Sequence, residues 1–278
     1  LGFVEAKGIQ DKIVPRTPEN LYIEEGQKII RQLNCQSCHM IEGEGGTIQE
    51  SVKQWLIKHD GKSADEAAAI VLSFSPPNLV GEGKKVQPQW LFDFLHQPTT
   101  IRPWLKVRMP TYTFNADHLN SLLQYFNALD KEPFPFTDNV DVNLTQEEYL
   151  AAEKLFSDEY FDCAKCHIVG DKMPGGSPEN WAPNFALAKT RLKPGWILEW
   201  MKNPAALLPG TKMPTYFDPE NYHESGPPDI LNGDEDTQIR VLRNYLNTIA
   251  PLTTSQETKK NPEVKEAPET LVAPAVSK

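Results

Sequence analysis

The chain has 278 residues, of which 39% are hydrophobic, and it carries a formal net charge of −10. This length predicts two domains rather than one, and the low apolar content indicates that something besides side chains helps to fill the core. The negative charge argues against a nucleic-acid partner, which needs clustered lysine and arginine, and is compatible with a cationic protein partner.

The sequence gives no sign of a membrane span. A spanning helix needs roughly 18 apolar residues, and the longest apolar run in the chain, AAAIVLSF at 67–74, is too short. The chain starts at Leu1, so we expect a mature protein whose export signal is absent. Residues 1–17 are expected to form an N-terminal extension.

Two predicted helices each lead into a cysteine motif. The first, PENLYIEEGQKIIRQL at 18–33, precedes CQSCH at 35–39. The second, TQEEYLAAEKLF at 145–156, precedes CAKCH at 163–167, and its Thr145 and Glu148 form a capping-box pattern. The chain has four cysteines, and these two motifs contain all of them.

Four kinds of site use cysteines in such patterns. Two disulfides would leave the histidines unexplained, a zinc site would have to join two distant motifs, and a thioredoxin-like redox pair needs no histidine after it. Covalent haem attachment uses the whole motif, because the two thiols add to the vinyl groups and the histidine binds the iron. The sequence therefore favours two covalently attached haem c groups. Their attachment residues are Cys35, Cys38 and His39 in the first motif, and Cys163, Cys166 and His167 in the second.

Further landmarks repeat after each motif. In the first half PNL at 77–79, WLFDFLHQP at 90–98 and RMPTY at 108–112 correspond to PNF at 183–185, WILEWMKNP at 196–204 and KMPTY at 212–216 in the second. The step from proline to tryptophan is the same in both halves (90 − 77 = 196 − 183 = 13). Each half ends in a helical pattern, at 115–129 and 234–249, with Asn115 and Asp234 as N-cap candidates. The matched spacing predicts an internal duplication.

This order of landmarks resembles that of class I c-type cytochromes, and the whole chain resembles a dihaem tandem of them. The resemblance implies an all-α fold with two such domains, at 18–131 and 144–251, joined by a linker at 132–143. The last segment, 252–278, is expected to be an extended tail. Its composition predicts disorder unless the tail, like the N-terminal extension, packs on a partner subunit.

The two halves differ in where they carry insertions. The first has a long insertion, residues 43–75, in which 49–59 and 63–74 are expected to be extra helices. The second has a run rich in proline, glycine and aspartate at 218–233, which we expect to be a loop.

Met109 and Met213 are the expected second iron ligands, because they occupy equivalent positions and each precedes Pro-Thr-Tyr. Methionine with histidine is the usual axial pair of cytochromes c and raises the reduction potential. The alternative is that both methionines only fill gaps in the core. Four histidines have no counterpart in the other half and are weaker candidates for the iron: His59, His96, His118 and His223.

In the resembled family a backbone carbonyl near Pro-Asn-Leu accepts the ring N–H of the ligating histidine, which implies this role for Pro77 and Pro183. Trp90 and Trp196 follow that loop and are expected either to form a wall of the haem pocket or to pack in the core.

The residues around each methionine are further candidates. Arg108 and Lys212 are expected either to lie beside the haem propionates, where a cation offsets buried negative charge, or to be solvated. Tyr112 and Tyr216 are expected to hydrogen-bond near a propionate or to pack.

The resemblance implies a respiratory electron carrier at the periplasmic or otherwise exported face of a membrane. It would be a soluble shuttle or the cytochrome subunit of a membrane oxidoreductase complex, with redox proteins as partners. The alternative is a dihaem enzyme, such as a cytochrome c peroxidase or a thiosulfate dehydrogenase, which needs an open sixth position on one haem. A haem-based gas sensor is a third possibility. His59, inside the first insertion, is the residue to test for an enzyme.

Overall fold

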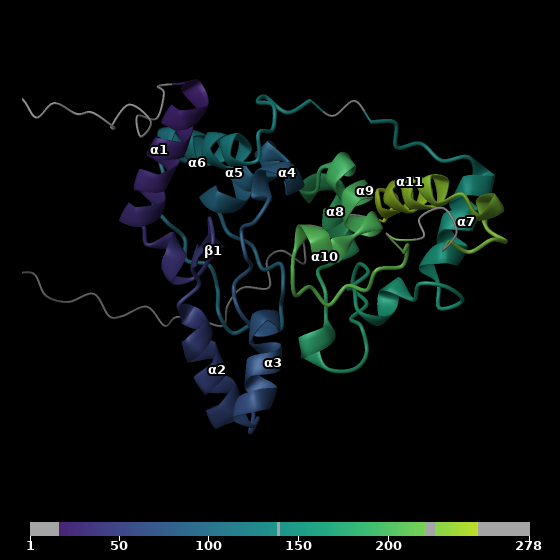
Figure 1. Cartoon of the computed structure of the whole chain (residues 1–278), viewed down its shortest axis with the longest axis horizontal. Coiled ribbons are helices and arrows are strands. Elements are labelled where there is room, and N and C mark those ends of the chain that lie inside the picture. The colour runs from purple at the N-terminus through teal and green to yellow at the C-terminus, as the bar shows by residue number, and fades with distance from the viewer. Residues whose placement is uncertain (1–16, 138–139, 219, 221–225, 250–278) are drawn as a thin grey trace, which may run out of the picture.

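The computed structural model describes residues 17–137, 140–218, 220 and 226–249. Most of the predicted N-terminal extension and the whole predicted tail lie outside these residues. The described part of the chain is mainly helical and forms two halves joined by an extended connection (Figure 1). This confirms the predicted all-α fold class. No helix in the described ranges combines the length and the apolar character needed to cross a membrane.

The first half contains the predicted terminal helices and the predicted insertion. Its helices are α1 (Pro18–Gln32), α2 (Ile48–His59), α3 (Ala64–Phe74), α4 (Glu82–Lys85), α5 (Pro88–His96) and α6 (Ala116–Leu129). The 3-10 turn η2 (Cys35–Ser37) follows α1, and the short strands β1 (Met40–Ile41) and β2 (Glu44–Gly45) pair antiparallel.

The core of the first half forms where α1 packs against α6. Gly26 permits this close approach, because a Cβ at that position would lie 2.3 Å from the Cβ of Tyr125. Ile29 and Ile30 of α1 join Leu122 of α6 in the same buried cluster. As predicted, α6 begins after Asn115, whose side chain accepts a hydrogen bond from the N–H of His118 at 2.8 Å.

The insertion forms a separate hairpin of α2 and α3 that projects from the first half (Figure 1). It has its own small core around Val52, Leu56 and Ala67. Ser63 and Glu66 form a capping box that starts α3. Both extra helices predicted from the sequence are therefore confirmed.

The second half repeats the scheme with shorter first and last helices. Its helices are α7 (Gln146–Phe156), α8 (Ala188–Arg191), α9 (Pro194–Lys202), α10 (Pro204–Leu207) and α11 (Glu235–Leu246). Its 3-10 turns are η3 (Cys163–Lys165), η4 (Pro178–Asn180), η5 (Phe185–Leu187) and η6 (Leu231–Gly233). Helix α7 packs against α11, and the predicted capping box of Thr145 and Glu148 and N-cap of Asp234 are present.

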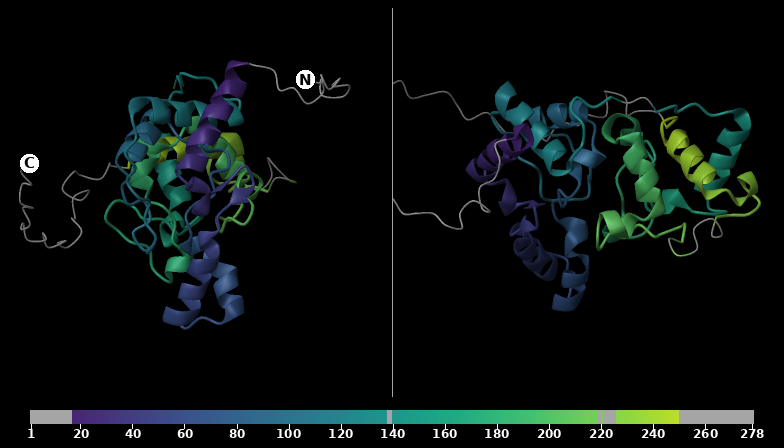
Figure 2. Two further views of the ribbon diagram at one scale, coloured as in Figure 1. Left: turned by 90° about the vertical axis from the view of Figure 1, so that its left-hand side faces the viewer. Right: turned by 45° about the horizontal axis from the view of Figure 1, so that its top comes forward.

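The two halves lie side by side (Figure 2, right), and they meet through equivalent elements. Helices α4 and α8 are separated by the same number of residues as α5 and α9 (188 − 82 = 194 − 88 = 106). Helix α4 contacts α9, and α5 contacts α8, so each half offers the same pair of helices to the other.

The backbone contacts between the halves are reciprocal. Val86 and Leu192, which are equivalent in the repeat, form an antiparallel bridge. The N–H of Gln87 donates to the carbonyl of Arg191 at 2.9 Å. The N–H of Lys193 donates in turn to the carbonyl of Lys85 at 2.9 Å, which is the same bond with the halves exchanged. Such exchange of partners is typical of an interface with approximate two-fold symmetry.

Candidate haem-binding sites

Both cysteine motifs fold into the same turn. The residue before each first cysteine has a left-handed backbone, with φ of 54° at Asn34 and 47° at Asp162. Asparagine and aspartate tolerate this conformation better than most residues, so the sequence suits the turn. The histidine N–H then donates back to the carbonyl of the first cysteine, at 2.9 Å for His39 and 3.0 Å for His167.

Each motif histidine is oriented by a proline carbonyl. Nδ1 of His39 lies 2.8 Å from the carbonyl oxygen of Pro77, and Nδ1 of His167 lies 2.9 Å from that of Pro183. A carbonyl only accepts, so Nδ1 carries the proton and Nε2 is left as a potential metal ligand. Burial lowers the pKa of His39, and lowers that of His167 to about 4. Both rings are therefore neutral at pH 7, the state that binds iron.

The cysteine side chains are half-buried thiols. Burial raises the pKa of Cys35, and raises that of Cys163 to about 12. Within the described residues no disulfide joins the cysteines, and no three or more His, Cys, Asp and Glu side chains form a group that could hold a metal ion. The two motifs thus lie in the structure as separate turns.

The proline loops are held against the residue after each histidine. The N–H of Leu79 donates to the carbonyl of Met40 at 3.0 Å, and the N–H of Phe185 donates to that of Ile168 at 2.9 Å. In the second half the ring of Phe185 also stacks on His167, with centroids 4.1 Å apart. The loop therefore fixes the tautomer of the imidazole in both halves and, in the second half, the plane of its ring.

The methionine loops are tied to the same turns by tyrosine. The hydroxyl of Tyr112 donates to the carbonyl of Leu33 at 3.4 Å, and that of Tyr216 donates to the carbonyl of Phe161 at 2.7 Å. Each carbonyl lies two residues before the first cysteine of its motif. Met109 and Met213 are both half-buried.

Trp90 and Trp196 lie where the two halves meet. The guanidinium of Arg191 lies over the ring of Trp90, 4.9 Å from its centroid, and the ammonium of Lys85 lies 5.8 Å from the ring centroid of Trp196. Each tryptophan ring thus contacts a cation from the opposite half. The two cations, Lys85 and Arg191, are equivalent in the repeat (191 − 85 = 106).

Arg108 and Lys212 are exposed and have protein partners. Arg108 donates to the backbone carbonyls of Val107 and Pro103 at 3.3 and 3.2 Å. The ammonium of Lys212 lies 3.3 Å from the side-chain oxygen of Asn180. These contacts favour the alternative in which both cations lie at the surface.

Three other cations are half-buried near the contact between the halves, and we call Lys85, Arg102 and Arg191 the interface cations. Burial lowers the pKa of all three, to about 10 for Arg102, and repulsion from Arg191 adds to the effect at Lys85 and Arg102. Glu82, only 5% exposed, offsets part of this charge. Sequence reasoning missed these residues, although the equivalence of Lys85 and Arg191 was a usable signal.

Two buried N–H groups near this region have no partner in the described structure, Nε of Arg191 and Nε1 of Trp104. Leaving such a donor unpaired costs about 1–3 kcal/mol, so a missing acceptor is indicated. A haem brings two carboxylates, apolar bulk and an iron atom. The half-buried cations, the unpaired donors, the neutral imidazoles and the half-buried thioethers fit that group.

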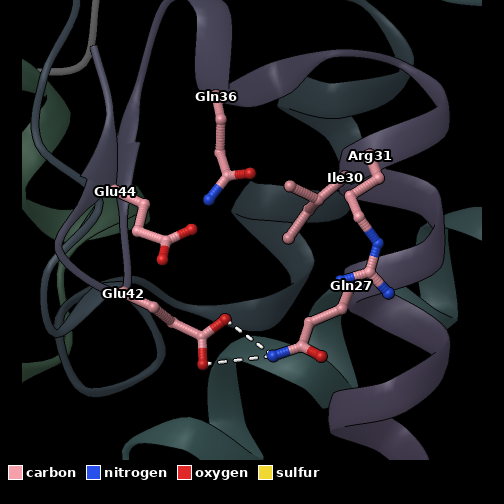
Figure 3. A pocket seen from close by; sticks show the side chains of 6 residues that line it. All are labelled: Gln27, Ile30, Arg31, Gln36, Glu42 and Glu44. Atoms are coloured by element: carbon pink, nitrogen blue, oxygen red, sulfur yellow. Dashed lines mark hydrogen bonds between the residues drawn. The ribbon is translucent and has the colours of Figure 1, made fainter.

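Figure 3 shows a different pocket, of about 320 Å³, between α1 and the β1–β2 hairpin. Gln27 donates from Nε2 to Glu42 at 2.9 Å, and the buried Tyr125 hydroxyl donates to the same carboxylate at 2.8 Å. None of the predicted iron ligands lines this pocket. The hydrogen bonds therefore fix the hairpin on α1 rather than forming part of the iron site.

Comparison with protein families matches residues 23–126 to the cytochrome c family. No curated protein and no solved structure matches the chain. The matched range contains the first motif, its proline loop and the loop that carries Met109. The first half of this chain therefore contains a domain of the cytochrome c family, which binds haem c covalently and transfers electrons.

Proposed function

We propose that the chain is a dihaem electron carrier, with one cytochrome c domain at 18–131 and a second at 144–251. The first haem would be attached to Cys35 and Cys38 and the second to Cys163 and Cys166. When bound, each haem iron supplies one-electron chemistry between Fe(III) and Fe(II). The residues of the chain would hold the iron ligands in place.

One observation carries the proposal: the three features that position the motif and its histidine in the first half recur in the second. The left-handed residue before the cysteine, the bond from histidine to proline carbonyl and the bond from tyrosine to the chain just before the motif are all duplicated. The reciprocal contacts between the halves are what a tandem duplication of one unit would produce.

The paired methionines support a carrier over a dihaem enzyme. An enzyme needs an open position on one iron, whereas Met109 and Met213 sit on loops that are tied down in the same way. Histidine with methionine fills both axial positions and raises the potential. The proposed setting is a respiratory chain at the exported face of a membrane, with a redox protein or a membrane oxidoreductase as partner. The net charge of −10 suits a cationic docking surface on that partner.

The test is the mass of the purified holoprotein and of two double variants. The wild type is expected to exceed the polypeptide mass by two haems. Cys35→Ala/Cys38→Ala and Cys163→Ala/Cys166→Ala are each expected to retain one. A single haem in the wild type, lost only in the first variant, would show that the second motif binds none and would overturn the dihaem proposal. Rapid CO binding by the reduced wild type would instead favour the enzyme or the sensor.

A further inference from the structure

The sulfur of Met213 has a hydrogen-bond donor in the structure. The indole Nε1 of Trp200, on α9, contacts Sδ of Met213 and is placed to donate a hydrogen bond to it. Trp200 is half-buried and its ring stacks on Trp196, with centroids 4.9 Å apart and planes inclined at 19°. The indole is therefore held in place from one face while its N–H points at the thioether.

The first half has the same stack without the donor. Phe94 is equivalent to Trp200 (200 − 94 = 106). It stacks on Trp90 with centroids 4.9 Å apart and planes inclined at 14°, nearly the same geometry. A phenyl ring has no N–H, so at this equivalent position the first half has no hydrogen-bond donor.

A thioether sulfur has two lone pairs, so it can bind iron with one and accept a hydrogen bond with the other. The donor places the positive end of its dipole near the iron and draws electron density from the sulfur. Both effects disfavour the more positively charged ferric state, so the hydrogen bond raises the reduction potential. Burial strengthens the effect, because little water is available to screen the dipole.

From this geometry we infer that Trp200 is a positioning residue for the second haem. It holds Met213 toward the iron and raises the potential of that haem above the value that a phenylalanine would give. The inference rests on the proposed function, because it requires Met213 to bind a second haem iron. The donor on α9 would therefore give two otherwise similar haems different reduction potentials.

The test compares Trp200→Phe with its mirror variant Phe94→Trp in the holoprotein. Potentiometric titration gives the potential of each haem, and the weak red absorption band of ferric methionine-ligated haem reports ligation. Trp200→Phe keeps the stack on Trp196 and removes the donor. It is expected to shift the reduction equilibrium of one haem about two- to tenfold toward ferric, the effect of one hydrogen bond, and to leave the other unchanged. Phe94→Trp is expected to shift the other haem in the opposite direction.

Loss of the band for one haem in Trp200→Phe would also support the inference, because it shows that the indole holds the methionine. Unchanged potentials in Trp200→Phe with the band intact would overturn it. If Trp200→Phe yields no holoprotein, Phe94→Trp decides, and no rise in the first haem's potential overturns the inference. A wild type with two haems but only one methionine band would instead refute the ligation on which the proposed function depends.

Discussion

At the scale of single residues, Arg191 shows why a half-buried cation needs a counter-charge. Its guanidinium lies over the ring of Trp90, its Nε has no partner, and burial lowers its pKa. Glu82 offsets only part of the charge that Arg191 shares with Lys85 and Arg102. A buried charge without compensation is costly, so haem carboxylates are the expected partners.

We predict that Arg191→Met lowers the reduction potential of at least one haem, because removal of a nearby positive charge stabilises the ferric state. Arg191→Lys keeps the charge and is expected to retain most of the potential, although it loses the planar contact with Trp90. Potentiometric titration of both variants checks this. Identical potentials in the wild type and Arg191→Met would show that the guanidinium acts only in packing.

At the scale of secondary-structure elements, the contact between α1 and α6 depends on one missing side chain. Gly26 lies against the buried Tyr125, and an added Cβ would come within 2.3 Å of it. At the corresponding contact of α7 with α11, the buried Ala152 packs in a cluster with Val241 and Leu242. The two helix pairs therefore approach each other through small residues.

Gly26→Ala is predicted to destabilise the holoprotein by about 1–3 kcal/mol, the usual cost of overpacking a core. Gly195→Ala is the matched control, since Gly195 also lies in a helix but a methyl group added there would meet nothing within 4 Å. That change is expected to be neutral or to stabilise by less than about 1 kcal/mol. Chemical denaturation of both variants measures the difference. Equal stabilities would mean that α1 and α6 can move apart at little cost.

Helices, caps and the repeat could be predicted from the sequence because they depend on local spacing. The capping box at Thr145 is one example, since residues three apart specify it, and the insertion helices are another, since they follow from the spacing of residues within one segment. The interface cations could not be predicted, because Arg191 meets Trp90 only after two distant helices pack. The contact between Trp200 and Met213 could not be predicted either, because an irregular segment of chain separates the two residues.

At the scale of the whole molecule, one buried ion pair joins the two halves. Lys193 is 3% exposed, and its ammonium lies 3.2 Å from the carboxylate of Glu132 in the linker. It also lies 3.5 Å from the side-chain oxygen of Asn127 and 4.7 Å from the ring centroid of Phe136. A lysine of the second half is thus enclosed by the end of the first half and the start of the linker.

Glu132→Gln is predicted to weaken this contact by up to about 3 kcal/mol, because it leaves the buried ammonium without its carboxylate. Lys193→Met removes the charge itself and is expected to be nearly neutral, and the double variant should resemble Lys193→Met. Thermal unfolding of all three variants tests the prediction. A Glu132→Gln protein as stable as the wild type would show that water, rather than Glu132, solvates the ammonium.

Because the two halves belong to one chain, the reciprocal contacts need only a small binding free energy to hold them together. A short connection such as residues 132–143 gives the two halves a millimolar effective concentration for each other. A contact with a dissociation constant near 1 mM, or about −4 kcal/mol, would already be half formed under these conditions. The interface can therefore be small and polar and still hold the two halves together.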